Sequence, residues 1–204
     1  MRHLLALVAM VHVAACVDDN DPSVEIDPVV DTIGEGEMRG TALAQQSREE
    51  LDGNAFDVTL GMTASILAAL NDSRVQEAVF ATNVVFADDT FDLAEELLDD
   101  HVEANVKLDN VVRSYGIPYL PSATADGVIA DSNAELSILR ATDPGNADFV
   151  YTQGQVVRLT ETLVLLDQLA VSVGPGAMAD HIAATHAMIE PNLDEAIDLL
   201  EDFY

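Results

Sequence analysis

Apolar residues recur at helical spacing through most of the chain from about residue 56 onward. The clearest stripe lies between 146 and 173, where successive apolar positions are three or four residues apart and only Thr152 interrupts them. Its members are Phe149, Val156, Leu159, Leu163, Leu166, Ala170 and Val173. Such a stripe lets one side of a helix pack against neighbouring helices. The pattern therefore predicts a bundle helix here.

Two more helices are predicted before this one. The first covers about 57–86 and has a weak position at "NDS" (71–73), where the apolar stripe is interrupted. The second begins after Asp88–Asp89, which are good N-cap residues, and ends at "YGIP". Gly116 can take the left-handed conformation that closes a helix, and Pro118 prevents the helix from continuing.

A shorter helix is predicted at about 123–141, and a fifth at 176–202. Pro191 lies inside the fifth and predicts either a kink or a new segment that starts at Glu190. Long helical patterns, short connections and no alternating strand pattern indicate an all-α domain over 56–204. The expected fold is a four- to five-helix bundle.

The N-terminal third has a different composition. "MRHLLALVAMVHVAAC" has a short basic start and an apolar run too short to span a bilayer, which predicts a secretion signal over residues 1–15. Residues 16–55 are rich in acids, proline and glycine, and predict an acidic flexible tether. A short helix within "MRGTALAQQSREEL" (38–51) is an alternative for part of it.

The residues "VAAC" at 13–16 resemble the lipobox of bacterial lipoproteins. This resemblance implies cleavage before Cys16 and acylation of that residue, so that a lipid anchor would hold the protein to a membrane. Cys16 is the only cysteine, and no intrachain disulfide can form. In such signals an aspartate directly after the cysteine favours the inner membrane. Because Val17 stands there, we expect the outer membrane, facing the periplasm of a Gram-negative bacterium. An ordinary signal peptide is the alternative.

The charge of the chain is strongly acidic. It has 8 Lys+Arg against 37 Asp+Glu, a formal net charge of −29. Nucleic-acid binding is not expected, because it needs basic residues that replace counterions. The acidic surface would attract a cationic or protein partner, or it serves only to keep the protein solvated.

The histidines that remain after signal cleavage are His101, His181 and His186. A ferritin-like di-iron site needs Glu-x-x-His, which places both ligands on one helix face, and this spacing is absent from the chain. His181 and His186 are five residues apart, so they point to different sides of a helix. No metal site is therefore predicted. Iron, manganese or zinc would need a site that combines His101 with distant acids.

His101 lies on the expected apolar stripe of its helix, within the acidic segment "EELLDDHVEANVKL" (95–108). Asn105 shares that stripe one turn later, and His186 holds a similar position in the last helix. We expect these three residues to form a buried polar site, with a role in helix register favoured over a chemical one. His181 falls beside its stripe and is expected to be exposed.

Two segments resemble a bacterial ferritin-like bundle family of unknown function whose members are often labelled outer membrane proteins. The first runs from "ILAALNDSRVQEAVF" through "DDHVEANVKLDNVVRSYGIPYLPS", and the second is "DFVYTQGQVV" (148–157). The matching residues are Asp100–His101, Asn105, Leu108 and Gly116–Ile117–Pro118. The resemblance covers about 58–202 and implies a ferritin-like arrangement of the helices.

The chain departs from that family where the family has further histidines. Arg158, Leu159 and Thr160 stand at one such place, and Asn192–Leu193 replaces a His-Leu pair. Nucleotide-binding and hydrolase motifs are also missing, so no enzyme activity is predicted. The function expected is that of a non-enzymatic envelope lipoprotein whose bundle is a binding or structural module. The alternative is a metal-binding or oxidoreductase bundle that uses His101.

Overall fold

The structure, a computed structural model, describes residues 40–204, with side chains from residue 57 onward. Within these residues the chain forms five α-helices and one short 3-10 helix, without a strand. They are α1 (Gly40–Ala81), α2 (Asp88–Tyr115), α3 (Ala123–Ala141), η1 (Pro144–Asn146), α4 (Ala147–Val173) and α5 (Ala177–Glu201). The predicted all-α bundle is confirmed. Cys16 and the predicted signal peptide lie outside the described residues.

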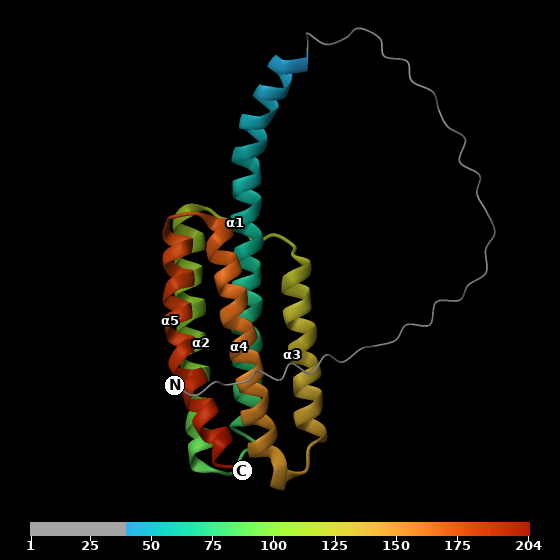
Figure 1. Cartoon of the computed structure of the whole chain (residues 1–204), viewed down its shortest axis with the longest axis vertical. Coiled ribbons are helices and arrows are strands. Elements are labelled where there is room, and N and C mark those ends of the chain that lie inside the picture. The colour runs from blue at the N-terminus through green and yellow to red at the C-terminus, as the bar shows by residue number, and fades with distance from the viewer. Residues whose placement is uncertain (1–39) are drawn as a thin grey trace, which may run out of the picture. The chain divides into compact units, whose positions relative to one another are not determined.

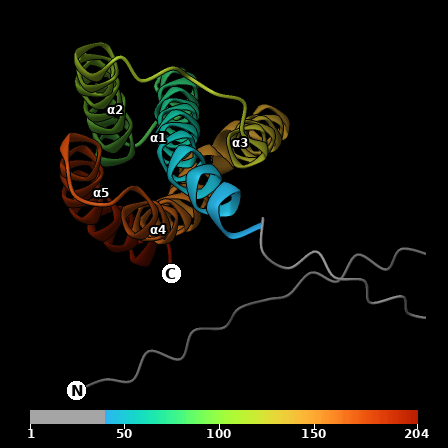
Figure 2. The same cartoon turned by 90° about the horizontal axis from the view of Figure 1, so that it is seen from above.

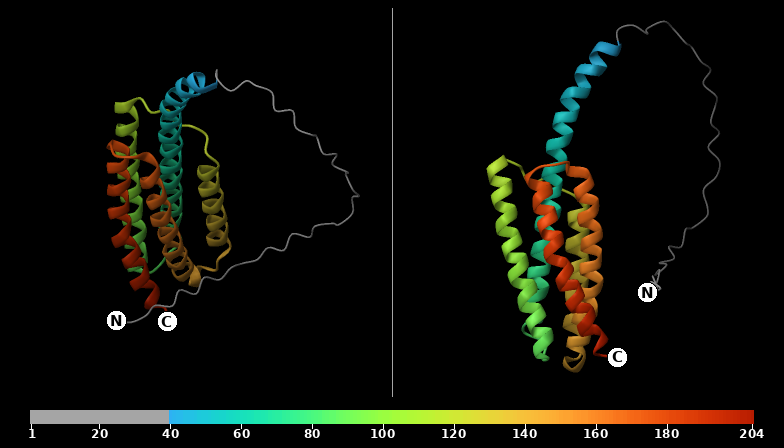
Figure 3. Two further views of the ribbon diagram at one scale, coloured as in Figure 1. Left: turned by 45° about the horizontal axis from the view of Figure 1, so that its top comes forward. Right: turned by 60° about the vertical axis from the view of Figure 1, so that its left-hand side comes forward.

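Four of the helices surround a common interior. Seen along the bundle, α1, α2, α5 and α4 follow one another around it, and α3 lies outside against α1 and α4 (Figures 1 and 2). The N-terminal part of α1 extends beyond the ends of the other helices (Figure 3). None of the helices in residues 40–204 is both long enough and apolar enough to cross a membrane.

The interior is packed mainly by leucine, isoleucine and alanine. Fully buried examples come from each of the four central helices: Leu67, Leu93, Leu97, Leu159, Leu166, Ile182 and Ile189. Small side chains such as Ala64, Ala94 and Ala196 let the helix backbones approach closely. Tyr151 is the largest of the fully buried side chains. This core agrees with the low aromatic content of the chain.

The start of α2 differs from the sequence prediction. Asp88 and Asp89 lie in the first helical turn, and the N-cap is Ala87, which has no capping side chain. The backbone N–H groups of Phe86 and Ala87 instead donate to the Asp148 carboxylate of α4, both at 2.9 Å. Asp88 and Asp89 therefore favour the helix through its dipole rather than as caps. The predicted end is confirmed, because Gly116 has a φ of 64°.

The connection between α2 and α3 is held against α1. The N–H of Leu120 donates to the carbonyl of Gly61 at 3.1 Å. A Cβ at Gly61 would lie 2.7 Å from the carbonyl oxygen of Pro118 and from the Leu120 side chain. Glycine is required here so that the loop can approach the helix.

The structure extends one predicted helix and excludes one of the two alternatives predicted at Pro191. Helix α1 runs from Gly40 through "NDS" without a break, so the predicted boundary between tether and bundle near 55 falls inside a helix. Helix α5 continues through Pro191, so no new segment starts at Glu190. Packing holds this helix on both sides of the proline, where Ile189 and Ala196 are fully buried.

Candidate functional site

One face of α1 brings polar residues into the bundle interior. Asn71, Arg74 and Glu77 are spaced three residues apart and are between 0% and 4% exposed. They lie between the apolar residues Leu67 and Ala78, which are also buried. The "NDS" segment is therefore not a weak point of the helix. It is where polar side chains enter the core.

Arg74 and Glu77 form an ion pair whose two side chains are 5% and 1% exposed. Burial lowers the pKa of the Arg74 guanidinium, and the Glu77 carboxylate opposes that shift. Taking two charges out of water is expensive, and only a partner of opposite charge makes it tolerable. Glu77 is that partner for Arg74.

Three other helices contribute polar groups to the same interior. We call the set the polar core: Asn71, Arg74, Glu77, His101, Tyr151, Thr152, Gln155 and Asn192. Each of these residues has at least one buried polar side-chain atom without a partner in the described protein. Leaving such an atom unsatisfied costs about 1–3 kcal/mol. The polar core therefore holds several buried donors and acceptors that no other described residue satisfies.

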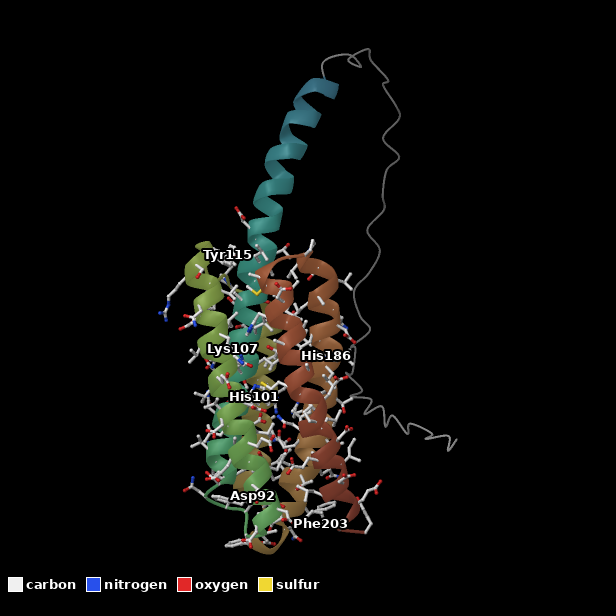
Figure 4. The ribbon with its side chains drawn as sticks, turned by 90° about the vertical axis from the view of Figure 1, so that its left-hand side faces the viewer. Asp92, His101, Lys107, Tyr115, His186 and Phe203 are labelled. Atoms are coloured by element: carbon white, nitrogen blue, oxygen red, sulfur yellow. The ribbon has the colours of Figure 1, made fainter. Side chains whose placement is uncertain are left out.

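His101 lies in this interior as predicted, midway along the bundle (Figure 4), and is 0% exposed. Its Nδ1 is 3.0 Å from the side-chain oxygen of Asn71. That amide oxygen can only accept, so Nδ1 carries the proton and Nε2 is left with a lone pair. Burial, together with the positive charge of Arg74, lowers the pKa of His101 to about 3. His101 is neutral at physiological pH.

The structure does not bring the three predicted site residues together. Asn105 is half-buried at the edge of the bundle, where it donates to the Asp72 carboxylate at 2.7 Å. His186 is also half-buried, with Nε2 3.5 Å from the Asp167 carboxylate. The expected exposure of His181 was wrong, because that residue is 6% exposed. Of the predicted set, only His101 belongs to the polar core.

A pocket of about 200 Å³ adjoins the polar core between α1, α3 and α4. We call it the arginine pocket, and its lining residues are Leu70, Arg74, Val128, Asp131, Arg158, Glu161, Thr162 and Leu165. Arg158 is fixed at two points: Nη1 lies 3.0 Å from the Glu161 carboxylate, and Nη2 donates to the backbone carbonyl of Asp131 at 3.1 Å. In the sequence, Arg158 was notable only as a departure from a family pattern. The pocket was not predicted.

No family model, curated protein or solved structure matches this chain. Among residues 40–204, no three His, Cys, Asp or Glu side chains are grouped so that they could hold a metal ion.

Helix α3 adds an acid beside the arginine pocket. Burial raises the pKa of the Glu135 carboxyl, and the nearby guanidinium of Arg158 opposes that shift. The side chain of Glu135 lies directly on Gly154 of α4, where a Cβ would collide with it. Gly154 thus lets α3 bring a carboxyl group close to α4.

The acids of "EELLDDHVEANVKL" mostly face solvent, away from His101. Glu95, Glu96, Asp99 and Glu103 are exposed, and Glu103 pairs with Lys107 at 2.8 Å on the surface. Where α2 meets α5, partial burial and the neighbouring Glu96 raise the pKa of Glu195. This face of the bundle is crowded with negative charge.

Proposed function

We propose that this protein is a cell-envelope lipoprotein whose helical bundle is a non-enzymatic binding module for a small polar ligand. In this proposal the acyl chains on Cys16 hold it to the outer membrane, facing the periplasm. In this proposal the bundle has a ferritin-like arrangement, although residues 40–204 hold no group of His, Cys, Asp or Glu side chains suited to a metal ion. The ligand binds where the polar core meets the arginine pocket.

The observation that carries the binding proposal is the position of Arg74. Its pairing with Glu77 uses Nη1, while the buried Nε has no partner in the described protein. The same residue lines a pocket that opens to solvent. A ligand with an accepting group that enters this pocket would meet the Arg74 guanidinium beside that of Arg158.

The binding proposal is tested by thermal unfolding of the full chain in detergent. The probes are four small polar molecules of different charge: alanine as a zwitterion, acetate as an anion, methylammonium as a cation and glycerol as a neutral molecule. At least one should raise the melting temperature saturably, because binding to the native state alone stabilises it. This gain should be lost in Arg158→Met and kept in Arg140→Met, which removes an arginine that lies over the Phe80 ring, outside the pocket. A melting temperature unmoved by all four probes would refute the binding module.

The anchor is tested separately by Cys16→Ser. Serine has no thiol to acylate, so the variant should move from the membrane fraction to the soluble fraction. Stable attachment requires two acyl chains or their equivalent, which this variant cannot carry. Val17→Ala, which keeps the cysteine, should stay with the membrane. If Cys16→Ser fractionates like the wild type, the protein is not held by lipidation.

A further inference from the structure

We propose that the arginine pocket binds a small zwitterion of the α-amino acid class, with its carboxylate inward and its ammonium group at the rim. This inference rests on the proposed function, because it names the ligand of the same site. It follows from the charges of the residues that line the pocket, from how deeply each of them is buried, and from the volume of the pocket.

The charges of the pocket are arranged by depth. The two arginines are the inner groups, since the side chains of Arg74 and Arg158 are only 5% and 15% exposed. The two acids form the rim, with the side chains of Asp131 and Glu161 68% and 59% exposed. A ligand that enters this pocket meets carboxylates first and guanidinium groups last.

A zwitterion fits this order better than a simple ion. A free anion would be repelled by the rim and by a chain of net charge −29. A free cation would be attracted to the rim, but the charged side chains that line the inner part of the pocket are those of Arg74 and Arg158. An amino acid has no net charge, and its two ends have the signs that the two depths require.

The inner donors suit a carboxylate. Guanidinium groups bind carboxylates through paired N–H donors, and such charge-assisted hydrogen bonds are stronger than neutral ones. Arg74 and Arg158 both line the pocket, so a carboxylate inside it meets two guanidinium groups. Arg158 keeps its bond to the backbone carbonyl of Asp131, which holds the guanidinium in place. The exposed carboxylates of Glu161 and Asp131 can then turn toward the ammonium group of the ligand.

The size and walls of the pocket restrict the ligand further. Pockets for drug-sized ligands are roughly 300–1,000 Å³, and this one is about 200 Å³. The apolar side chains of Leu70, Val128 and Leu165 line it. An amino acid with a short aliphatic side chain matches these limits.

The test is isothermal titration of the full chain in detergent with alanine, in either enantiomer, with acetate and with methylammonium. Alanine should bind about tenfold or more tightly than acetate or methylammonium, because each of these lacks one of the two charge-assisted contacts. Acetate that binds as tightly as alanine would overturn the zwitterion but leave the binding module standing. Methylammonium that binds as tightly as alanine would likewise overturn the zwitterion and leave the binding module standing. Binding of none of the three would overturn the zwitterion, and if glycerol also leaves the melting temperature unchanged, the proposed function falls with it.

Substitutions then locate the site. Arg158→Met and Asp131→Asn should each weaken alanine binding about tenfold or more, since each removes one end of the charge pattern. Asp131 is exposed, so its variant is expected to fold even if Arg158→Met does not. Asp126→Asn is the matched control, because it neutralises another exposed acid of α3 that does not line the pocket. Alanine binding that is unchanged in Asp131→Asn and in folded Arg158→Met would place the ligand elsewhere.

Discussion

Replacing Glu77 with glutamine is expected to lower the free energy of unfolding by about 3–5 kcal/mol. Glutamine fits the same space but leaves the Arg74 guanidinium without a counter-charge in the bundle interior. The Arg74 side chain is 5% exposed, so little solvent reaches the guanidinium in place of the lost partner. Urea unfolding of the protein made without its anchor (Cys16→Ser) measures this loss.

The double variant Arg74→Met/Glu77→Leu should be more stable than Glu77→Gln. It removes both charges together and leaves neither of them buried alone, which is often neutral or stabilising. Glu103→Gln is the matched control, because it breaks a pair with Lys107 whose side chains are 64% and 57% exposed. In this control the free energy of unfolding should fall by no more than about 1 kcal/mol. A Glu77→Gln variant as stable as this control would show that the buried pair is reached by water.

The signal for the polar core was present in the sequence, although the pattern there suggested a weakness. Ala64, Leu67, Asn71, Arg74 and Ala78 step by three and four residues, so the stripe of α1 continues through its polar members. Polar residues that keep the phase of an apolar stripe are buried with it. Selecting only apolar residues therefore made the helix seem interrupted where its most informative side chains lie.

The positions of Asn105 and His181 show a different limit of prediction. On α2 the buried positions are Leu97, His101, Ala104 and Leu108, so the stripe passes through Ala104 and leaves Asn105 at its edge. Both positions fit a helical repeat, because residues three and four positions after His101 lie about equally close to its side of the helix. The direction from which neighbouring helices approach decides between them. In α5 the same effect buries His181 and leaves His186 half-exposed.

The arginine pocket needed tertiary information. Arg74, Arg158 and Asp131 come from three helices, and the place where α3 packs determines whether they meet. The sequence of α3 has only a weak apolar stripe, which does not specify the side of the bundle it covers. The helix itself was predicted with the bounds that the structure shows, 123–141.

Lowering the pH from 7.5 to 5 should cost the wild type about 2 kcal/mol of stability through His101 alone. The pKa of this histidine is about 3 in the folded protein, against 6.5 for a histidine in an unfolded chain. Between these values the unfolded chain binds a proton that the native protein does not. The stability that neutral His101 contributes is therefore fully present above pH 6.5 and is lost as the pH falls toward 3.

Comparison with His101→Gln isolates this effect, since other titrating groups are common to both proteins and cancel. The wild type should lose about 2 kcal/mol relative to that variant over the same interval. Asn105→Ala, which changes a non-titrating residue one turn along α2, should keep the wild-type dependence. Arg74 also lowers the pKa of His101, so the difference should shrink in the Arg74→Met/Glu77→Leu background. Equal pH dependence in the wild type and His101→Gln would mean that His101 is protonated in the folded bundle as readily as in the unfolded chain, and the polar core would then be open to solvent.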